Sequence, residues 1–375
     1  MSIRIAHIMY SFGTGGLEGM VAQLINRLET QTFSHAVFTL SNDTSSRDRI
    51  IRGGVSIAVV KRAFPHDPSC AIRLALALRA YNPNIVRTYN WSGIEGIMAA
   101  GMIKAKTVIH SEHGFDADEV DVKKTRRVFA RRFFLNRCSR VIAVSKCLRR
   151  WLIEDVKIEK SKVLYIPNGC DMNEFHPGRE NALRKSLGIG AEDVVIGNVG
   201  TLCRIKDHNS LIKAFQGVAK RHPHTRLLIV GDGPLKKELE ALISAGGISD
   251  RVIFTGRIKD TAPYYRVMDI FVLTSLSENM PNALIQAMAT GIPVVATDVG
   301  DIRDITGPNI GAVIVRPKDV EAVEKGILYF LGCPDEAKRV GDALRRKAEA
   351  SYDIEKISKE YEALYREAVA EHVGR

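Results

Sequence analysis

The stretch Thr274–Thr297, TSLSENMPNALIQAMATGIPVVAT, contains the signals that decide the fold. A β-strand is predicted just before it, over Asp269–Thr274, and Pro281 suits the first position of a helix because its fixed φ is already helical. Gly-Ile-Pro then ends this helix, and Val-Val-Ala predicts the next buried strand. A helix start offers unpaired backbone N–H groups and the positive end of the macrodipole to an anion. With the acidic Glu278 beside it, after a parallel strand, this helix start predicts a site for a nucleotide or sugar phosphate.

On both sides of this stretch, short β-rich runs alternate with amphipathic helical patterns. This alternation predicts βαβ units and parallel, doubly wound sheets. The predicted strands are Ile3–Met9, His35–Leu40, Val55–Val60, Ile85–Thr88, Thr107–His110, Arg140–Val144, Val163–Ile166, Val194–Val199, Leu227–Val230, Val252–Phe254, Ile270–Leu273, Val294–Ala296 and Ala312–Val315. The predicted helices are Leu17–Leu28, Ala71–Ala80, Ile94–Ile103, Asn209–Lys220, Leu235–Ala245, Pro281–Thr290 and Val320–Phe330. The turn-rich segment Pro167–Glu180 separates the two series, which indicates two Rossmann-like domains.

Length and composition agree with two globular domains. The chain has 375 residues, of which 45% are hydrophobic and 26% charged, and its formal net charge is +11. No run reaches the ~18 apolar residues that a membrane-spanning helix needs. The N-terminal run has no cleavage pattern of a signal peptide, and the six cysteines show no CxxC spacing. These features predict a cytoplasmic protein with reduced thiols and an anionic partner.

Several motifs in order resemble family 4 glycosyltransferases, which are retaining enzymes of the two-domain GT-B fold. They are GGLE at 15–18, SEHG at 111–114, IPNGCDMNEFHP at 166–177, VGTL and KD within 199–207, VGDGP at 230–234, FTG at 254–256, and the stretch quoted above with the DVG that follows it. The resemblance implies an acceptor-side domain over 1–170 and a donor domain over 171–352, facing each other across a cleft. The amphipathic segment 353–375 is then expected to be a helix that closes the second domain or crosses back to the first.

The resemblance also implies a donor site, and the sequence departs from the family pattern at two of its positions. Lys206 matches the family lysine on the donor diphosphate, but the family arginine falls on Thr201, so that Arg204 is the candidate substitute. Glu278 is expected at the donor sugar. Position 286, a glutamate in the family, is Gln286, which can accept a ribose hydrogen bond but without a charge, so we expect weaker nucleotide affinity.

Other positions are implied in the same way. Further substrate contacts are expected from the first loop, from the residues that flank the nucleobase and from the helix start: Gly15, Gly16, Arg257, Ile258, Asn279, Met280, Pro281 and Asn282. His113, at the carboxyl end of the fifth strand, is expected near the donor sugar, whereas His110 is expected to be a hydrogen-bonded histidine of the core or the sheet edge. The first loop is not a dinucleotide fingerprint, because Glu18 stands where the third glycine should be.

These observations predict a retaining glycosyltransferase with His113, Lys206 and Glu278 as catalytic residues. The expected donor is a UDP-sugar, with a GDP-sugar second, and the expected acceptor is a glycan or lipid-linked glycan in cell-surface polysaccharide synthesis. The GGLE motif with the LINRL that follows also resembles bacterial exopolysaccharide and exosortase-associated sugar transferases. No metal or other cofactor is expected, because fixed positive groups do the work of a metal. The acidic pair Asp116 and Asp118 has the DxD form of a metal site, but such spacing is common by chance.

The segment 123–150 contains eleven Lys and Arg residues and no acidic residue. Its interleaved phenylalanines suit docking on the anionic inner face of the cytoplasmic membrane, which would make the protein peripheral. A plain solvated surface is the second interpretation. Nucleic acid is not expected, because no recognition motif accompanies the charge.

Three alternatives stay open. A nucleotide-sugar epimerase would share the fold and the donor site. A non-catalytic glycan- or membrane-binding relative is suggested by Thr201 and Gln286. A nicotinamide oxidoreductase is disfavoured by Glu18.

Overall fold

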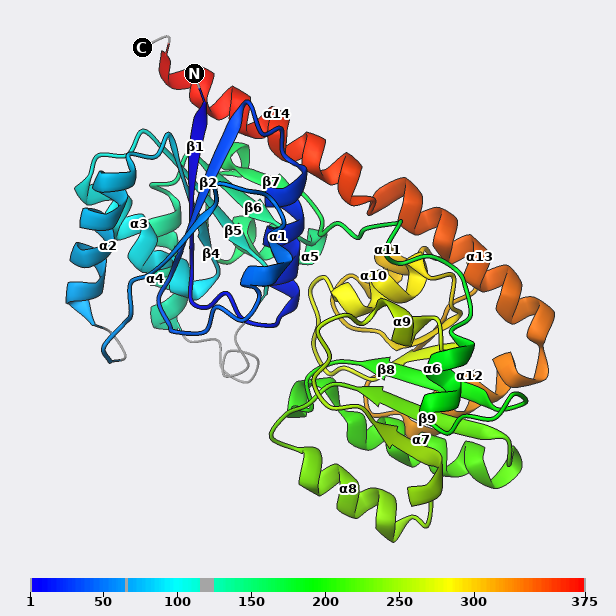
Figure 1. The fold of residues 1–375 in the computed structure, drawn as a ribbon. Helices are drawn as coiled ribbons and strands as arrows, with labels where there is room; N and C mark the ends of the chain where they lie inside the picture. The colour runs from blue at the N-terminus through cyan, green and yellow to red at the C-terminus, as the bar shows by residue number, and fades with distance from the viewer. Residues whose placement is uncertain (1, 65–66, 115–124, 374–375) are drawn as a thin grey trace. The chain divides into compact units, whose positions relative to one another are not determined.

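The computed structural model describes residues 2–64, 67–114 and 125–373, and it divides into two compact units. Unit 1 comprises residues 1–169 with 354–375, and unit 2 comprises residues 170–353. Each unit is a parallel sheet flanked by helices, and Figure 1 shows the sheet of each unit with helices against both of its faces. The fold class is therefore α/β with two Rossmann-like units, as predicted.

Unit 1 contains a seven-stranded parallel sheet in the order β3-β2-β1-β4-β5-β6-β7. Its strands are β1 Ile3–Met9, β2 Phe33–Thr39, β3 Ser56–Val59, β4 Ile85–Tyr89, β5 Thr107–Glu112, β6 Arg140–Ala143 and β7 Val163–Tyr165. Its helices are α1 Gly16–Arg27, α2 Pro68–Tyr81, α3 Ile94–Met102, α4 Thr125–Leu135, α5 Lys146–Glu154 and α14 Ile354–Val373. The strand order reverses between β1 and β4, so right-handed crossovers place α1 on one face of the sheet and α2, α3 and α4 on the other.

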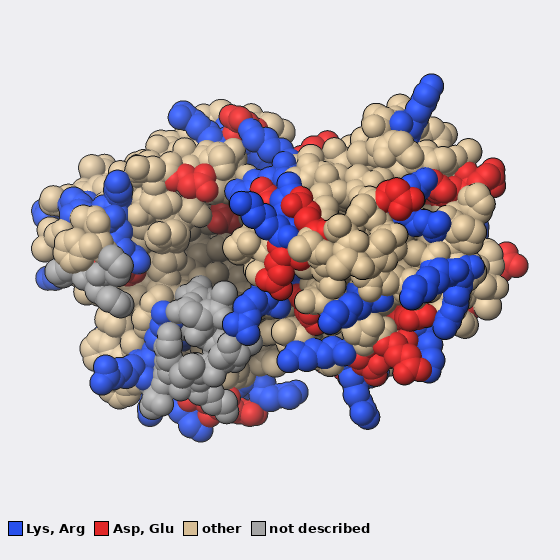
Figure 2. Space-filling model, turned by 90° about the horizontal axis from the view of Figure 1, so that it is seen from below, with Lys and Arg blue, Asp and Glu red and all other residues tan. Residues whose placement is uncertain are grey.

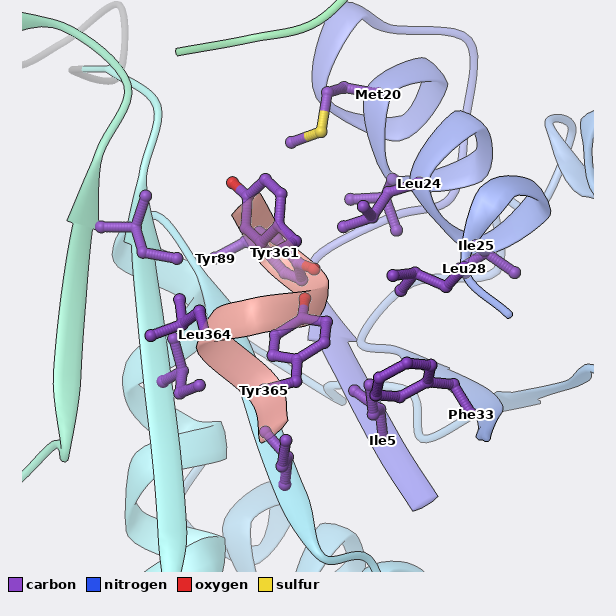
Figure 3. Packing of buried hydrophobic residues seen from close by; sticks show 14 of the residues in the cluster. Ile5, Met20, Leu24, Ile25, Leu28, Phe33, Tyr89, Tyr361, Leu364 and Tyr365 are labelled. Atoms are coloured by element: carbon purple, nitrogen blue, oxygen red, sulfur yellow. The ribbon is translucent and has the colours of Figure 1, made fainter. Parts of the chain in front are cut away.

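Helix α14 belongs to unit 1, although it follows unit 2 in the chain. Figure 3 shows Tyr361, Leu364 and Tyr365 of α14 directed into the same core as Leu24 of α1 and Leu28, which directly follows α1. These apolar residues recur at helical spacing in the sequence. Because they are buried against the sheet of unit 1, their packing holds α14 on this unit.

A buried arginine strengthens this attachment. Arg87 of β4 donates to the hydroxyl of Tyr365 and to Ser111 Oγ, the latter at 2.6 Å. Its guanidinium carbon lies 4.9 to 5.4 Å from the ring centroids of Tyr89, Tyr361 and Tyr365. Burial alone would lower the pKa of Arg87, but the surrounding tyrosine oxygens outweigh it and raise the pKa, so the side chain is charged. The faces of aromatic rings stabilise such a cation.

Unit 2 contains a six-stranded parallel sheet in the order β10-β9-β8-β11-β12-β13, which reverses between β8 and β11. Its strands are β8 Val194–Val199, β9 Thr225–Val230, β10 Val252–Phe254, β11 Ile270–Leu273, β12 Val294–Thr297 and β13 Val313–Val315. Its helices are α6 Asn181–Ser186, α7 His208–Arg221, α8 Lys236–Ala245, α9 Ala262–Tyr265, α10 Asn282–Ala289, α11 Ile302–Thr306, α12 Val320–Gly332 and α13 Pro334–Ser351. Helix α7 packs on α8 and α12, and α10 packs on α9 and α13.

Candidate active site

An ion pair lies at the point where the strand order of unit 2 reverses. Lys206 follows β8 and Glu278 follows β11, and Lys206 Nζ is 2.5 Å from Glu278 Oε1. Ser275 Oγ donates to the same carboxylate oxygen at 2.6 Å. The Glu278 side chain is only 9% exposed, whereas that of Lys206 is 27% exposed. The ammonium group has three N–H donors, so Lys206 can bind a further anion while it contacts Glu278.

Backbone contacts between the two loops fix this pair. Leu276 N donates to Ile205 O at 2.7 Å, and Thr274 Oγ1 donates to the carbonyls of Lys206 and Asp207 at 3.1 and 2.9 Å. Asp207 adopts the left-handed conformation, with φ 44°, and its side chain caps the start of α7. Asp207 thereby ends the 3-10 turn that carries Lys206, and the lysine is positioned by a rigid helix start.

A second layer of hydrogen bonds joins the same two strands below the ion pair. Asn198 of β8 donates to Val272 O of β11 at 2.8 Å, and its Oδ1 contacts His208 Nε2 at 2.9 Å. Burial, and then the charge of Lys206, lower the pKa of His208 to about 4. His208 is therefore neutral near pH 7 and adds no charge to the site.

Two glycines let backbone segments approach the ion pair closely. Gly300 has φ +55°, and a Cβ there would lie 2.0 Å from the carbonyl oxygen of Glu278. Gly231 has φ +150°, and a Cβ there would lie 1.9 Å from the carbonyl oxygen of Gly200, in the loop that leads to Lys206. Both positions therefore require glycine.

The helix after Glu278 begins one residue later than predicted. Pro281 is the N-cap of α10 rather than its first residue, because its ψ of 107° is extended, and its carbonyl accepts from the amides of Leu284 and Ile285. No side chain caps this helix start. The amides of the first turn of α10 are therefore not capped by a side chain, and the predicted anion site would begin one residue later than expected.

Gln286 accepts a hydrogen bond from a buried tyrosine, Tyr265, that the sequence analysis did not identify. The hydroxyl of Tyr265 lies 3.0 Å from Gln286 Oε1 and 3.1 Å from the carbonyl oxygen of Ala283. Tyr265 is fully buried, with its ring beside those of Phe175 and Phe271. The side chain of Gln286, half-buried on α10, is thus oriented by a fixed neighbour.

The structure places the other predicted donor residues around these elements. Arg204 and Arg257 are exposed, Ile258, Asn279 and Asn282 are half-buried, and Met280 and Pro281 are buried. Arg204 shares the 3-10 turn with Lys206, and Arg257 and Ile258 follow β10. The side chain of Met280 therefore lies in the interior, and a ligand would meet its backbone.

In unit 1, His113 follows β5 as predicted. Its backbone N–H donates to Asn90 Oδ1 at 2.7 Å, and its ring centroid is 6.0 Å from that of Tyr89. Both ring nitrogens are enclosed, although the residue as a whole is half-buried. Burial, and then the nearby Arg87, lower the pKa of His113 to about 3, so its imidazole is neutral. His110 contacts Thr88 and Glu112 in the core, as predicted.

The glycine loop after β1 leads into α1. Gly15 is the N-cap of α1, and Gly16 is its exposed first residue. The carboxylate of Glu18 accepts a hydrogen bond from Ser11 Oγ at 3.3 Å, and burial raises the pKa of Glu18. This loop and His113 therefore border the carboxyl ends of β1 and β5.

The basic segment 123–150 is not uniformly a solvated surface. Arg131 is buried, and its Nε lies 3.2 Å from Glu112 Oε2. Arg140 forms ion pairs with Glu367 and Glu371 of α14. The acidic pair Asp116 and Asp118 lies outside the described residues, and within those residues no group of three or more His, Cys, Asp or Glu could bind a metal.

Some of the missed residues carried a local signal. Asp207 followed by His-Asn-Ser is a typical start of a helix, and it identifies the N-cap beside Lys206. Ser275 and Thr274 directly follow a predicted strand at its carboxyl end. Tyr265 and Asn198 carried no such signal, because their partners are 21 and 10 residues away in the sequence.

Two family models match consecutive parts of the chain. The model of Glycosyltransferase Family 4 matches residues 14–174, and that of Glycosyl transferases group 1 matches residues 179–347. Among curated proteins, a putative glycosyltransferase EpsF of Bacillus subtilis is 25% identical over 307 residues, which are 79% of each chain. A UDP-Gal:alpha-D-GlcNAc-diphosphoundecaprenol alpha-1,3-galactosyltransferase of Escherichia coli is 25% identical over 264 residues, which are 68% of each chain.

Solved structures share the fold over nearly the whole chain. HepE of Anabaena in complex with UDP and glucose matches with a TM-score of 0.85 at 19% identity, over 97% of this chain and 100% of that one. Sucrose-phosphate synthase of Thermosynechococcus elongatus matches with a TM-score of 0.84 at 23% identity, over 98% and 99% of the two chains. These likenesses show the fold, which is GT-B.

Proposed function

Because this chain belongs to the family 4 glycosyltransferases, we propose that it transfers a sugar from a nucleotide-diphosphate donor, with retention of configuration, to a glycan or lipid-linked glycan. A UDP-sugar is the first candidate donor and a GDP-sugar the second. The observation that carries the proposal is the contact between Lys206 and Glu278 at the carboxyl ends of β8 and β11. In open parallel sheets, ligands bind where the strand order reverses.

In this proposal, Lys206 neutralises the charge that develops on the departing nucleotide diphosphate. Two of its three N–H donors remain after the contact with Glu278. Arg204, exposed on the same 3-10 turn, and the first turn of α10 supply further positive potential. Fixed positive groups of this kind stabilise a leaving phosphate without reorganisation, and we propose that no metal is required.

Glu278 has the complementary role at the sugar. Its carboxylate is oriented by Lys206 and Ser275, so that it can accept hydrogen bonds from sugar hydroxyls. We assign the acceptor side to unit 1, with the loop of Gly15 and Gly16, and keep His113 of the same unit as the candidate residue near the donor sugar. Both ring nitrogens of His113 are enclosed in this structure, so the proposed contact requires that the imidazole becomes accessible to the sugar. Its neutral form could then exchange a hydrogen bond with a sugar hydroxyl without adding charge.

The relatives support the donor and acceptor classes. The E. coli relative is named for UDP-Gal and for a diphosphoundecaprenol-linked sugar, and HepE was solved with UDP, glucose and UDP-glucose. We propose that the acceptor belongs to cell-surface polysaccharide synthesis. We also propose that the protein works at the inner face of the cytoplasmic membrane as a peripheral protein. No helix within the described residues is long and apolar enough to cross a membrane.

The test is a turnover assay in EDTA with a panel of UDP- and GDP-sugars and polyprenyl-diphosphate-linked sugars as acceptors. The expected result is metal-independent release of nucleoside diphosphate with an α-linked product from an α-linked donor, resolved by NMR. Glu278→Gln should abolish release, whereas Lys213→Ala, an exposed lysine of α7, should not. Conversion of the donor sugar without an acceptor would instead support an epimerase. Binding without turnover would support the non-catalytic alternative.

A further inference from the structure

Exposed apolar side chains gather on three neighbouring helices of unit 1. Six of the eleven large hydrophobic residues that are exposed among the described residues lie on α2, α3 and α4. They form one pair on each helix, spaced by four residues, and their exposed fractions range from 37% to 69%. The pairs are Ile72 with Leu76, Met98 with Met102, and Phe129 with Phe133.

Residues four apart lie on the same side of a helix, so each pair is a short outward stripe. Helix α3 contacts both α2 and α4, and all three cover the face of the sheet opposite α1 and α14. The three stripes therefore lie on adjacent helices of one face of unit 1, and we name these six residues together the three-helix face. Single exposed apolar residues are ordinary, but a gathering of exposed apolar pairs on adjacent helices indicates a binding surface.

The charges on the three-helix face are almost all positive. Exposed cations lie on these helices or directly after them: Arg73, Arg79, Lys104, Lys106, Arg126, Arg132 and Arg137. Glu95, the one acidic residue within the three helices, is half-buried and paired with Arg62. Asp67, the buried N-cap of α2, is paired with Arg73. Figure 2 shows Lys and Arg interspersed with Asp and Glu over the face that it presents.

We propose that the three-helix face is the surface by which this protein lies on an anionic phospholipid bilayer. The proposal deepens the peripheral location proposed above and rests on it. In this proposal the docking surface is no longer the segment 123–150 alone, because α2 and α3 each contribute as many exposed apolar residues as α4. Apolar side chains surrounded by cations match the boundary between acyl chains and anionic headgroups.

Charge also argues against a second copy of the chain as the occupant. Two copies joined through this face would bring cations such as Arg126 and Arg132 of each against those of the other, with no exposed acidic residue on the three helices to compensate. A bilayer containing anionic lipid instead supplies the opposite charge, and each Lys or Arg near such a surface strengthens binding about fivefold.

The test is flotation with vesicles of 30% phosphatidylglycerol in phosphatidylcholine, compared with pure phosphatidylcholine. One variant removes an apolar side chain from each helix, Leu76→Ser with Met102→Ser and Phe129→Ser. A second removes charge, Arg79→Gln with Arg126→Gln and Arg132→Gln. A control variant changes two exposed apolar residues elsewhere, Ile51→Ser with Tyr329→Ser.

The wild type and the control should float with anionic vesicles and stay unbound with neutral ones. The charge variant should bind about 100-fold more weakly, from about fivefold for each of three cations, and the apolar variant should bind at least about tenfold more weakly. Binding should also weaken at high salt. Equal flotation of all variants, or equal binding to both vesicle types, would overturn the proposal. A wild-type dimer in light scattering that the apolar variant dissociates would also overturn it and identify a second copy as the occupant.

Nucleotide binding separates this proposal from the proposed function. The stabilisation of each variant by UDP or GDP is measured without vesicles, and it should match that of the wild type because the three-helix face lies in unit 1. If no nucleotide stabilises the wild type, the proposed function fails while the flotation result still decides the docking surface.

Discussion

Two buried histidines of unit 1 should make this unit sensitive to mild acid. His7 Nε2 lies 3.0 Å from His35 Nδ1, and His7 Nδ1 lies 2.8 Å from the hydroxyl of Tyr89. Burial, and then the charge of Arg52, lower the pKa of His35 to about 3. Burial, and then His35 and Arg87, lower the pKa of His7 well below its usual value. Both imidazoles are therefore neutral in the folded protein.

The sign of the effect follows from the unfolded chain, in which a histidine titrates near pH 6.5. Below that pH the unfolded state binds a proton that folded His35 does not, so stability is complete above about pH 6.5 and is lost as the pH falls toward 3. At pH 5.5, one unit below the unfolded pKa, His35 alone should cost about 1.3 kcal/mol relative to pH 7.5.

The assay is urea unfolding at pH 7.5 and 5.5, followed by tryptophan fluorescence. The chain has two tryptophans, Trp91 and Trp151, and both lie in unit 1, so the signal reports this unit. In His35→Asn the side-chain amide can replace Nδ1 of His35 as the hydrogen-bond partner of His7. The variant should lose about 1.3 kcal/mol less than the wild type between the two pH values. A loss equal to that of the wild type would refute the assignment, and His224→Asn, exposed in unit 2, serves as the control.

Three further substitutions test particular contacts. Gly300→Ala should displace the Glu278 carbonyl, which would lie 2.0 Å from the new Cβ, and so reduce kcat at least about tenfold in a turnover assay, with unit 1 unaffected in urea. Tyr265→Phe should raise the donor KM about threefold to tenfold in the wild type but not in a Gln286→Ala background, because Tyr265 acts through Gln286; additive effects would contradict this. Arg87→Lys keeps the positive charge but removes the planar guanidinium group that contacts the hydroxyls and the aromatic rings. The free energy of unfolding of unit 1, measured in urea, should fall by about 1 to 3 kcal/mol. An unchanged midpoint of urea unfolding would show that the guanidinium group does not contribute to stability.

Local sequence patterns were sufficient to predict most of the sheet framework. Apolar runs bounded by turn residues predict β1, β8 and β11 within about one residue of their observed bounds, because buried parallel strands are continuous apolar segments. The same patterns place Lys206 and Glu278 after two of the predicted strands, and the structure shows that these strands are neighbours and that the two side chains are in contact. The functional roles of these residues remain predictions.

The features that were missed depend on tertiary contacts. The helix α13, Pro334–Ser351, was not predicted, because its charged sequence has few apolar positions and its buried side is defined by α10. The bond between Tyr265 and Gln286 joins two helices and leaves no local pattern. Within the three-helix face the sequence singled out only the segment 123–150, because it shows which residues of a helix are apolar but not which of them stay exposed.

The central claim is that Lys206 binds the diphosphate of a nucleotide, and calorimetric titration of UDP and of GDP in EDTA tests it most directly. Lys206→Ala removes a charge-assisted contact worth about 1.5 to 3 kcal/mol and leaves the nearly buried Glu278 carboxylate to repel the phosphates. We expect metal-independent binding of one of the two nucleotides, weakened at least about tenfold in Lys206→Ala and unchanged in Lys213→Ala. Equal affinity in wild type and Lys206→Ala, or no binding of either nucleotide to the wild type, would contradict it.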